Sequence, residues 1–319
     1  MADSVRAAVL AAPGRYELQE LPYPRLEDGA LLMQVEMVGI CGTDKHTYAG
    51  ETKQYAGTPA ETDTPFPIIQ GHENVGVVAE ITPTAAERIE FYGRRLAVGD
   101  RITMCPDVVC GRCYECTHVL GYVWCENSEC YGNSFTSAEP PHLLGGMAEY
   151  MYLRPDTFVY KVPDGLSPRV AVLAELMACT ASLDKLKEFS SYALEGFNSG
   201  DTVVVIGTGP LGLLHVAKAD MMGAGQIIAT DLSEHRLAWA RRCGAEHVCS
   251  KNIRLVGLTN HPSTGYGPAL RLLERYADRY PFAEMVTHEF GLHQADEALH
   301  TSMDPRSMKV AIVPGSTQG

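Results

Sequence analysis

No apolar run in this 319-residue chain reaches the length of a membrane span, and its amino terminus, MADSVRAAVL, lacks a signal-peptide pattern. Positive charge is also scarce, with 26 Lys and Arg against 39 Asp and Glu and a formal net charge of −13. Without a basic stripe to neutralise phosphates, we expect no nucleic-acid partner and no anionic membrane surface as partner. These absences predict a cytoplasmic protein.

The composition that remains is that of a globular protein. Hydrophobic residues make up 45% and charged residues 20% of the chain, and its length allows two domains of ordinary size. Ten cysteines without a secretion signal predict reduced thiols, some of them metal ligands, rather than a disulfide framework.

The first half of the chain predicts short, closely spaced strands, which is typical of a small barrel-like β domain. These strands are expected at 5–10, 31–38, 75–81, 148–153 and 158–162, and the segment 98–103 is expected to be a tight turn that leads into another strand.

After Pro163 the pattern changes to alternating helices and strands. Helices are expected at 167–189, 210–222 and 234–242, and buried strands at 202–206, 227–230 and from 247. This βαβαβ order predicts half of a doubly wound parallel sheet. Further elements are expected as strand 253–258, helix 269–280, strand 286–290, helix 294–303 and strand 310–313.

Two short motifs, C-G-T-D-K-H at 41–46 and G-H-E at 71–73, bring metal-binding chemistry into one region. They supply the Cys41 thiolate, the His46 and His72 imidazoles, the Glu73 carboxylate and the Thr43 hydroxyl. A catalytic zinc site needs a few such ligands, an open position and a route for a proton. The alternative is a buried cysteine and a surface histidine that never meet.

A second cluster consists of Cys110, Cys113, Cys116 and Cys125. The C-x2-C-x2-C spacing lets one tight loop direct three thiolates at one ion, and a fourth closes a tetrahedral, structural zinc site. Four unrelated thiols are the alternative, and either Cys105 or Cys130 could substitute for one of the four.

The segment G-T-G-P-L-G directly follows a predicted strand and opens a predicted helix. Its candidate cofactor-binding residues are Gly207, Gly209, Pro210, Leu211 and Gly212. Such a loop lets a pyrophosphate approach the backbone at a helix amino terminus.

About twenty residues later, Asp231 ends the next strand, where a carboxylate accepts hydrogen bonds from ribose hydroxyls and repels a 2′-phosphate. This favours NAD(H) over NADP(H), although Arg236 complicates the preference. A glycine turn without a ligand is the alternative interpretation of the loop.

Glu175 lies in an apolar helical stretch, A-E-L-M-A-C. A carboxylate buried there needs a partner, and a metal would provide one. The alternatives are a solvent-facing glutamate and, as a competing ligand one turn on, Cys179.

In combination and order, these motifs together with V-G-D-R-I and G-G-M-A-E-Y resemble the medium-chain, zinc-dependent alcohol dehydrogenases, including the polyol, threonine and glucose dehydrogenase branches. The resemblance implies an α/β plus β fold. A GroES-like β-barrel catalytic domain would comprise 1–166 and 286–319, and a Rossmann-type parallel-sheet domain would comprise 167–285, with the active site between them.

The resemblance also implies roles. Cys41, His72 and Glu175 would bind a catalytic zinc, with Glu73 an alternate ligand or supporting carboxylate. Asp44 would orient a ligating histidine. Thr43 would hydrogen-bond the substrate oxygen, His46 would pass the proton to solvent, and the alcohol would give hydride to NAD.

The chain departs from the family pattern in two places. The last gap of the cysteine cluster, residues 117–124, has one residue more than usual, which a loop absorbs. More seriously, roughly 60–90 residues of the second half of the nucleotide-binding fold are missing after position 248, so the Rossmann domain should be truncated after its first βαβαβ half.

The expected function is therefore hydride transfer between a small alcohol or polyol and NAD(H), with two zincs per chain. The truncation leaves two alternatives open: a redox-neutral zinc lyase or isomerase, and a non-catalytic zinc-stabilised module. A homo-oligomer is expected, because removing strands exposes apolar surface and strand edges.

Overall fold

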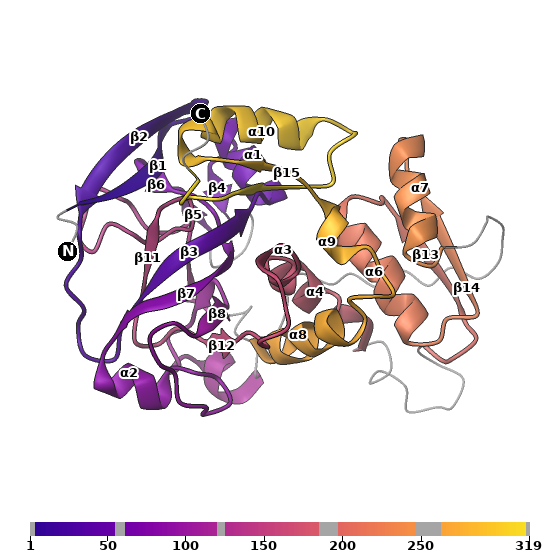
Figure 1. Cartoon of the computed structure of the whole chain (residues 1–319), viewed down its shortest axis with the longest axis horizontal. Coiled ribbons are helices and arrows are strands. Elements are labelled where there is room, and N and C mark those ends of the chain that lie inside the picture. Colours follow the sequence, from indigo (N-terminus) through magenta and orange to yellow (C-terminus); the bar gives the residue numbers. More distant parts are fainter. Residues whose placement is uncertain (1–3, 55–60, 120–124, 185–196, 246–262, 317–319) are drawn as a thin grey trace.

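The computed structural model describes residues 4–54, 61–119, 125–184, 197–245 and 263–316. Figure 1 shows a large β-rich part beside a smaller part of helices and strands, with short helices between them. Within the described ranges, no helix has both the length and the apolar character needed to cross a membrane.

The β-rich part is formed mainly by two sheets. Its strands are β1 (Ser4–Ala12), β2 (Arg15–Pro22), β3 (Leu31–Gly39), β4 (Lys53–Gln54), β5 (Thr62–Asp63), β6 (Ile68–Ile69), β7 (Glu73–Ile81), β8 (Arg101–Met104), β9 (Asp107–Val108), β10 (Glu129–Cys130), β11 (Tyr150–Leu153) and β12 (Val159–Lys161). One sheet has the order β2-β1-β6, and the main sheet runs β12-β8-β7-β3 with β11 also pairing β3. Side chains of β1, β3 and β11 share one apolar core between the sheets.

The carboxyl-terminal segment returns to this main sheet. It forms β15 (Val286–Phe290), the 3-10 turn η4 (Leu292–Gln294), α10 (Ala295–Met303) and β16 (Lys309–Ile312). β16 pairs antiparallel with β3 and parallel with β15, and it thereby extends the sheet beyond β3. Figure 1 shows this segment, in yellow, lying along the β-rich part.

The smaller part begins with a strand–helix–strand–helix unit: β13 (Thr202–Ile206), α6 (Pro210–Met221), β14 (Gln226–Thr230) and α7 (Glu234–Arg242). β13 and β14 pair in parallel, and within the described residues they form a sheet of two strands. The strands predicted from 247 and at 253–258 lie outside those residues. On β13, alternate residues reach solvent, with Val204 37% and Ile206 81% exposed.

Short helices join the two parts: α3 (Pro168–Ala171), α4 (Ala174–Cys179), η3 (Ser263–Gly265), α8 (Tyr266–Arg275) and α9 (Phe282–Met285). A single apolar cluster runs from Val75 of β7 through Leu173 to Leu213 of α6. The interface between the parts is therefore a packed core, in which α4 contacts both β7 and α6.

The single helix predicted at 167–189 is wrong in its first half. The chain forms two separate helices there, with a turn at Val172 and Leu173 between them. Both helices contact β7 and α8, but α3 also packs against β3 and α9 whereas α4 also packs against α6 and η3, so tertiary packing overrides the helix propensity of the intervening residues. Residues 185–189 lie outside the described ranges.

The sequence patterns also missed β2, α1 (Gly42–Tyr48), α2 (Pro83–Arg88) and the π-helical turn η1 (Glu115–Val119). The tight turn predicted to lead into a strand at 98–103 is confirmed, because Val98 and Gly99, with φ +91° at Gly99, form a turn and β8 begins at Arg101. The other predicted elements within the described ranges are confirmed in position to within a few residues, but β13, predicted to be buried, exposes alternate residues.

Candidate metal and nucleotide sites

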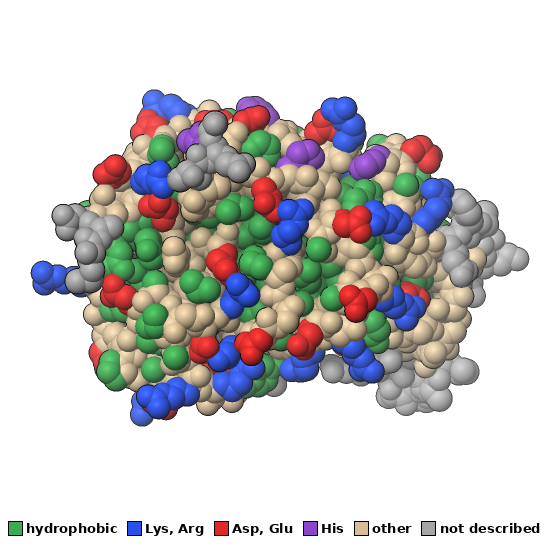
Figure 2. All heavy atoms as spheres, viewed as in Figure 1, with side chains coloured by type: hydrophobic (Ala, Val, Ile, Leu, Met, Phe, Trp, Pro, Cys, Tyr) green, Lys and Arg blue, Asp and Glu red, His purple; other side chains and the backbone are tan. Residues whose placement is uncertain are grey.

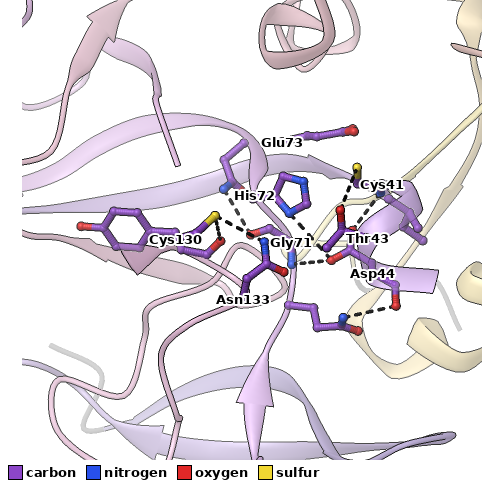
Figure 3. Close-up of polar contacts among 12 residues, drawn as sticks. Cys41, Thr43, Asp44, Gly71, His72, Glu73, Cys130 and Asn133 are labelled. Atoms are coloured by element: carbon purple, nitrogen blue, oxygen red, sulfur yellow. Dashed lines mark hydrogen bonds and ion pairs between the residues drawn. The ribbon is translucent and has the colours of Figure 1, made fainter. Parts of the chain in front are cut away.

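The completely buried carboxylate of Asp44 joins the two metal-binding motifs. Its Oδ2 accepts a hydrogen bond from the backbone N–H of Cys41 at 2.8 Å, and its Oδ1 accepts one from the N–H of Gly71 at 3.3 Å. Asp44 lies in the first turn of α1, three residues after Cys41, which is the N-cap of the helix. From this position its carboxylate reaches the backbone N–H groups of both motifs. Figure 3 shows Cys41, Thr43 and Asp44 grouped on one side of His72.

The backbone at Gly71 directs His72 toward Cys41. Gly71 has φ +94°, and a Cβ there would lie 2.6 Å from Cγ2 of Val38, so the turn requires glycine. The Nδ1 of His72 lies 4.0 Å from Oδ1 of Asp44 and is buried without a hydrogen-bond partner. Burial alone would lower the pKa of His72, but the neighbouring Cys41, Asp44 and Glu175 raise it well above its usual value.

Helix α4 brings Glu175 to this cluster from the other side of the core. Its side chain is buried, so the solvent-facing alternative does not hold. The thiol of Cys179, one turn on, donates a weak hydrogen bond to Oε1 of Glu175 at 3.7 Å. Burial and the adjacent Glu175 raise the pKa of Cys179 well above its usual value, which keeps Cys179 a neutral thiol.

Glu73 is held by a lysine that the sequence patterns missed. Nζ of Lys309, in β16, lies 2.8 and 2.5 Å from the two carboxylate oxygens of Glu73 and donates to the carbonyl of Ile40 at 3.1 Å. Burial alone would lower the pKa of Lys309, but Glu73 raises it. The only sequence signal was a lysine inside the apolar run M-K-V-A-I-V, where a charge needs a partner.

The donor set at Cys41, His72 and Glu175 fits a zinc ion. A thiolate, an imidazole and a carboxylate are common zinc ligands. The anionic neighbours Cys41, Asp44 and Glu175 that raise the pKa of His72 surround the same imidazole. The orphaned Nδ1 faces Asp44, the arrangement that fixes the orientation of metal-binding imidazoles. The ligand atoms of these three residues do not all lie within 4.8 Å of one another. In the described part of the chain, only a second cluster brings its ligand atoms that close together.

That second cluster is the cysteine loop. The sulfur atoms of Cys110, Cys113, Cys116 and Cys125 all lie within 4.8 Å of one another. Backbone N–H groups of Arg112 and Cys113 lower the pKa of Cys110 to about 6, whereas burial raises the pKa of Cys116 and of Cys125. Cys105 and Cys130, the possible substitutes, are buried away from this set.

Thr43 and His46 follow Cys41 on α1. The Thr43 hydroxyl lies 3.9 Å from the Cys41 sulfur, and His46, one turn further on, is largely exposed. The Nδ1 of His46 is 2.9 Å from a carboxylate oxygen of Glu51, a contact that the motif alone did not indicate.

The glycine loop after β13 has the geometry of a nucleotide-binding turn. Gly207 has φ +86°, Gly209 is the N-cap of α6, and a Cβ on Gly212 would clash with the carbonyl oxygen of Gly207. Pro210 and Leu211 form the first turn of α6. An open cavity of about 530 Å³ lies along this loop and β13, and Leu183 and His215 complete its lining.

Asp231 stands at the end of β14, but protein groups already use both its oxygens. Oδ2 accepts from the N–H of Thr208 at 2.8 Å and from its hydroxyl at 3.2 Å, while Oδ1 accepts from the N–H of Ser233 at 2.9 Å. Burial would raise the pKa of Asp231, but these hydrogen bonds lower it. Arg236 approaches Oδ2 to 4.0 Å, and its Nε is buried without a hydrogen-bond partner.

Comparisons with known proteins agree with this architecture. The family model described as alcohol dehydrogenase GroES-like domain matches residues 27–164. The chain is 34% identical over 248 residues to erythritol/L-threitol dehydrogenase of Mycolicibacterium smegmatis, which covers 76% of this chain and 62% of that protein. It is 28% identical over 363 aligned positions to 5-exo-hydroxycamphor dehydrogenase of Pseudomonas putida, covering 92% and 94%.

The fold is also that of a solved alcohol dehydrogenase from Thermotoga maritima, with a TM-score of 0.82, 22% identity and coverage of 98% and 99%. The chain spans less than two thirds of the length of the first curated relatives it matches. Family model, relatives and fold nevertheless agree, and over most of its length the chain is similar to medium-chain, zinc-type alcohol dehydrogenases.

Proposed function

We propose that this protein is a zinc-dependent oxidoreductase that transfers a hydride between a small alcohol or polyol and a nicotinamide dinucleotide. The observation that carries this proposal is the cluster of half-buried Cys41 with buried His72 and Glu175, in which Asp44 accepts a hydrogen bond from the Cys41 N–H and lies 4.0 Å from His72. The relative named for erythritol and L-threitol supports a polyol as the substrate class.

Two zinc ions per chain fit the side chains. Cys41, His72 and Glu175 would hold the catalytic ion. Glu73 serves as a nearby carboxylate, and its contact with Lys309 keeps it from being a permanent ligand. The structural ion would be held by Cys110, Cys113, Cys116 and Cys125. When bound, the catalytic zinc supplies a Lewis acid that lowers the pKa of a substrate hydroxyl, and the nicotinamide supplies a hydride acceptor.

The residues of α1 would handle the proton. Thr43 lies next to Cys41, so its hydroxyl is placed to accept a hydrogen bond from a substrate hydroxyl at the zinc. His46 stands three residues later on the same helix face and is open to solvent, where it can release the proton.

The cofactor side would be formed by Gly207–Gly212 and Asp231. The negative charge of Asp231, whose pKa is lowered, repels a 2′-phosphate and favours NAD(H). Arg236 acts in the opposite direction, because its guanidinium lies 4.0 Å from that carboxylate. We therefore infer a preference for NAD(H) rather than a strict requirement.

A shortened nucleotide-binding half is part of this proposal. The alignment with the camphor relative runs over 363 positions, more than the 319 residues of this chain, so that relative carries residues without a counterpart here. If these residues come from the nicotinamide side, the hydride acceptor is less firmly aligned and turnover is slow. A redox-neutral lyase or isomerase using the same zinc is the alternative, and the relatives named as dehydrogenases do not favour it.

Cys41→Ser tests the catalytic zinc directly. We expect zinc per chain to fall from two to one by elemental analysis, and NADH formation from a polyol panel to fall at least about a hundredfold. Cys243→Ser, at a buried thiol of the nucleotide part, is the control and should retain both ions.

Fully zinc-loaded protein that binds NADH but oxidises no alcohol or polyol would contradict hydride transfer. Catalysis that continues after complete removal of nucleotide would instead support the lyase or isomerase.

A further inference from the structure

His46 has a carboxylate partner that lies outside the C-G-T-D-K-H motif. Its Nδ1 is 2.9 Å from Oε2 of Glu51, and the backbone N–H of Glu51 donates to the carbonyl oxygen of His46, also at 2.9 Å. The loop after α1 thus folds back so that one residue contacts both the backbone and the ring of His46.

This contact determines which ring nitrogen is available. An ionised carboxylate can only accept hydrogen bonds, so Nδ1 carries the proton and Nε2 keeps its lone pair. A carboxylate in this position fixes both the tautomer and the orientation of an imidazole.

Other charged groups of α1 do not compete for the ring. Asp44 is buried on the N–H groups of Cys41 and Gly71, and the Lys45 ammonium donates to the carbonyl of Ser302 at 2.7 Å. Over the described ranges, Glu51 is the only side chain within hydrogen-bond distance of His46.

We propose that Glu51 is a positioning residue for the proton route, holding His46 in the Nδ1–H tautomer so that Nε2 can take the proton arriving from Thr43. This inference rests on the proposed function, because the route has a purpose only if an alcohol is deprotonated. Glu51 touches no reacting atom and acts entirely through His46.

Nitrogen NMR of histidine-labelled, zinc-loaded protein tests the contact without any turnover. In the wild type, neutral His46, assigned with His46→Gln, should show a protonated Nδ1. In Glu51→Ala it should shift to a protonated Nε2, the form that free imidazole side chains prefer in water. Glu61→Ala is the matched control, because Glu61 is paired with Lys53 at 2.6 Å in the neighbouring hairpin and its loss removes the same charge.

Kinetics test the role. We expect Glu51→Ala to lower kcat about tenfold with KM unchanged and to enlarge the solvent deuterium isotope effect, because proton transfer becomes slower. Glu51→Asp should recover part of the loss, and Glu61→Ala should behave as wild type. A Glu51→Ala protein with the wild-type tautomer, or with wild-type kcat and isotope effect, would overturn the proposal. If wild-type protein with both zincs and NAD bound is inactive, the proposed function fails, while the tautomer measurement still decides whether Glu51 positions His46.

Discussion

At the scale of single residues, the buried pair of Glu73 and Lys309 ties the metal-binding turn to the last strand of the sheet. Both side chains are almost completely shielded from water, and each charge is tolerated only because the other is present. Since His72 directly precedes Glu73, the position of the imidazole depends on this pair as well.

Replacing Lys309 alone should therefore be costly. We expect Lys309→Met to lower the free energy of unfolding by about 3–5 kcal/mol, because it leaves the Glu73 carboxylate buried and unpaired. Urea denaturation monitored by circular dichroism measures the change. The double variant Glu73→Gln/Lys309→Met should regain much of the loss, and a double variant as unstable as the single one would show that the pair itself stabilises the fold.

The residues of the candidate sites differ in how far the sequence predicted them. The cysteine loop is a local pattern, and its four thiols lie together as their spacing indicated. The Cys41 and His72 motifs are linked through Asp44, but that their side chains share a zinc ion stays a prediction. Lys309 escaped prediction because it meets Glu73 across 236 positions of sequence. Glu51 is only five residues from its partner His46, but nothing in the neighbouring sequence distinguishes it from an ordinary carboxylate in a loop.

At the scale of elements, the turn before β8 shows how one carboxylate sets the beginning of a strand. Asp100 accepts from the N–H of Ala97 at 2.9 Å and from Nζ of Lys161 in β12 at 2.6 Å. Burial would raise the pKa of Asp100, but Lys161 and the Ala97 N–H lower it. The V-G-D-R-I motif is thus a structural turn that links β8 to β12.

This lowered pKa predicts the pH dependence of stability. A carboxylate whose pKa is lower in the folded than in the unfolded state stabilises the fold at pH values above its unfolded-state pKa, which is about 3.9 for aspartate. This stabilisation is lost as the pH falls through the folded-state pKa. Asp100→Asn should reduce the free energy of unfolding by about 1 kcal/mol at pH 7, a modest value because the pair is partly exposed. Urea denaturation between pH 3 and 7 should show the difference from wild type shrinking at the acid end. A difference that stays constant across that range would contradict this origin.

Element prediction succeeded where periodicity was local and failed where packing decided. β13 and α7 begin and end at the predicted residues because apolar runs and an N-cap serine mark them. The region from 167 forms two short helices in place of one continuous helix, because α3 and α4 share β7 and α8 as neighbours but otherwise pack against different elements. α1 was missed because its seven residues carry no apolar stripe, and the hydrogen bond that the Asp44 carboxylate accepts from the N–H of Cys41 defines its start instead.

At the scale of the whole molecule, the smaller part presents an open strand. In the described ranges β13 pairs only with β14. The side chains of Val204 and Ile206 on β13 and of Leu211 at the start of α6 are exposed. The face in Figure 2 intersperses acidic and basic side chains, so no stripe of one sign covers it. An uncharged edge strand of sequence T-V-V-V-I invites pairing with another chain.

Self-association should therefore depend on β13. We expect wild-type protein to show a sedimentation coefficient that rises with concentration, and Ile206→Lys to weaken this rise, because a charge on an edge strand opposes pairing. Leu18→Lys is the control, since Leu18 is 50% exposed on β2 of the other sheet. Both variants should change the free energy of unfolding by no more than about 0.5 kcal/mol. Equal behaviour of the two variants would contradict a special role for β13.

The return of β16 to β3 also has a consequence for synthesis of the protein on the ribosome. The turn that carries His72 is made early, but Lys309, which neutralises its neighbour Glu73, emerges 236 residues later. At about 5–20 residues per second the nascent chain spends roughly 10–50 s without it. During that interval the strands of the β-rich part can collapse, but an unpaired carboxylate opposes burial of the metal-binding turn. We therefore expect any metal loading of the Cys41–His72 site to follow synthesis of β16, whereas the cysteine loop, whose four thiols lie within 16 residues, could capture an ion earlier.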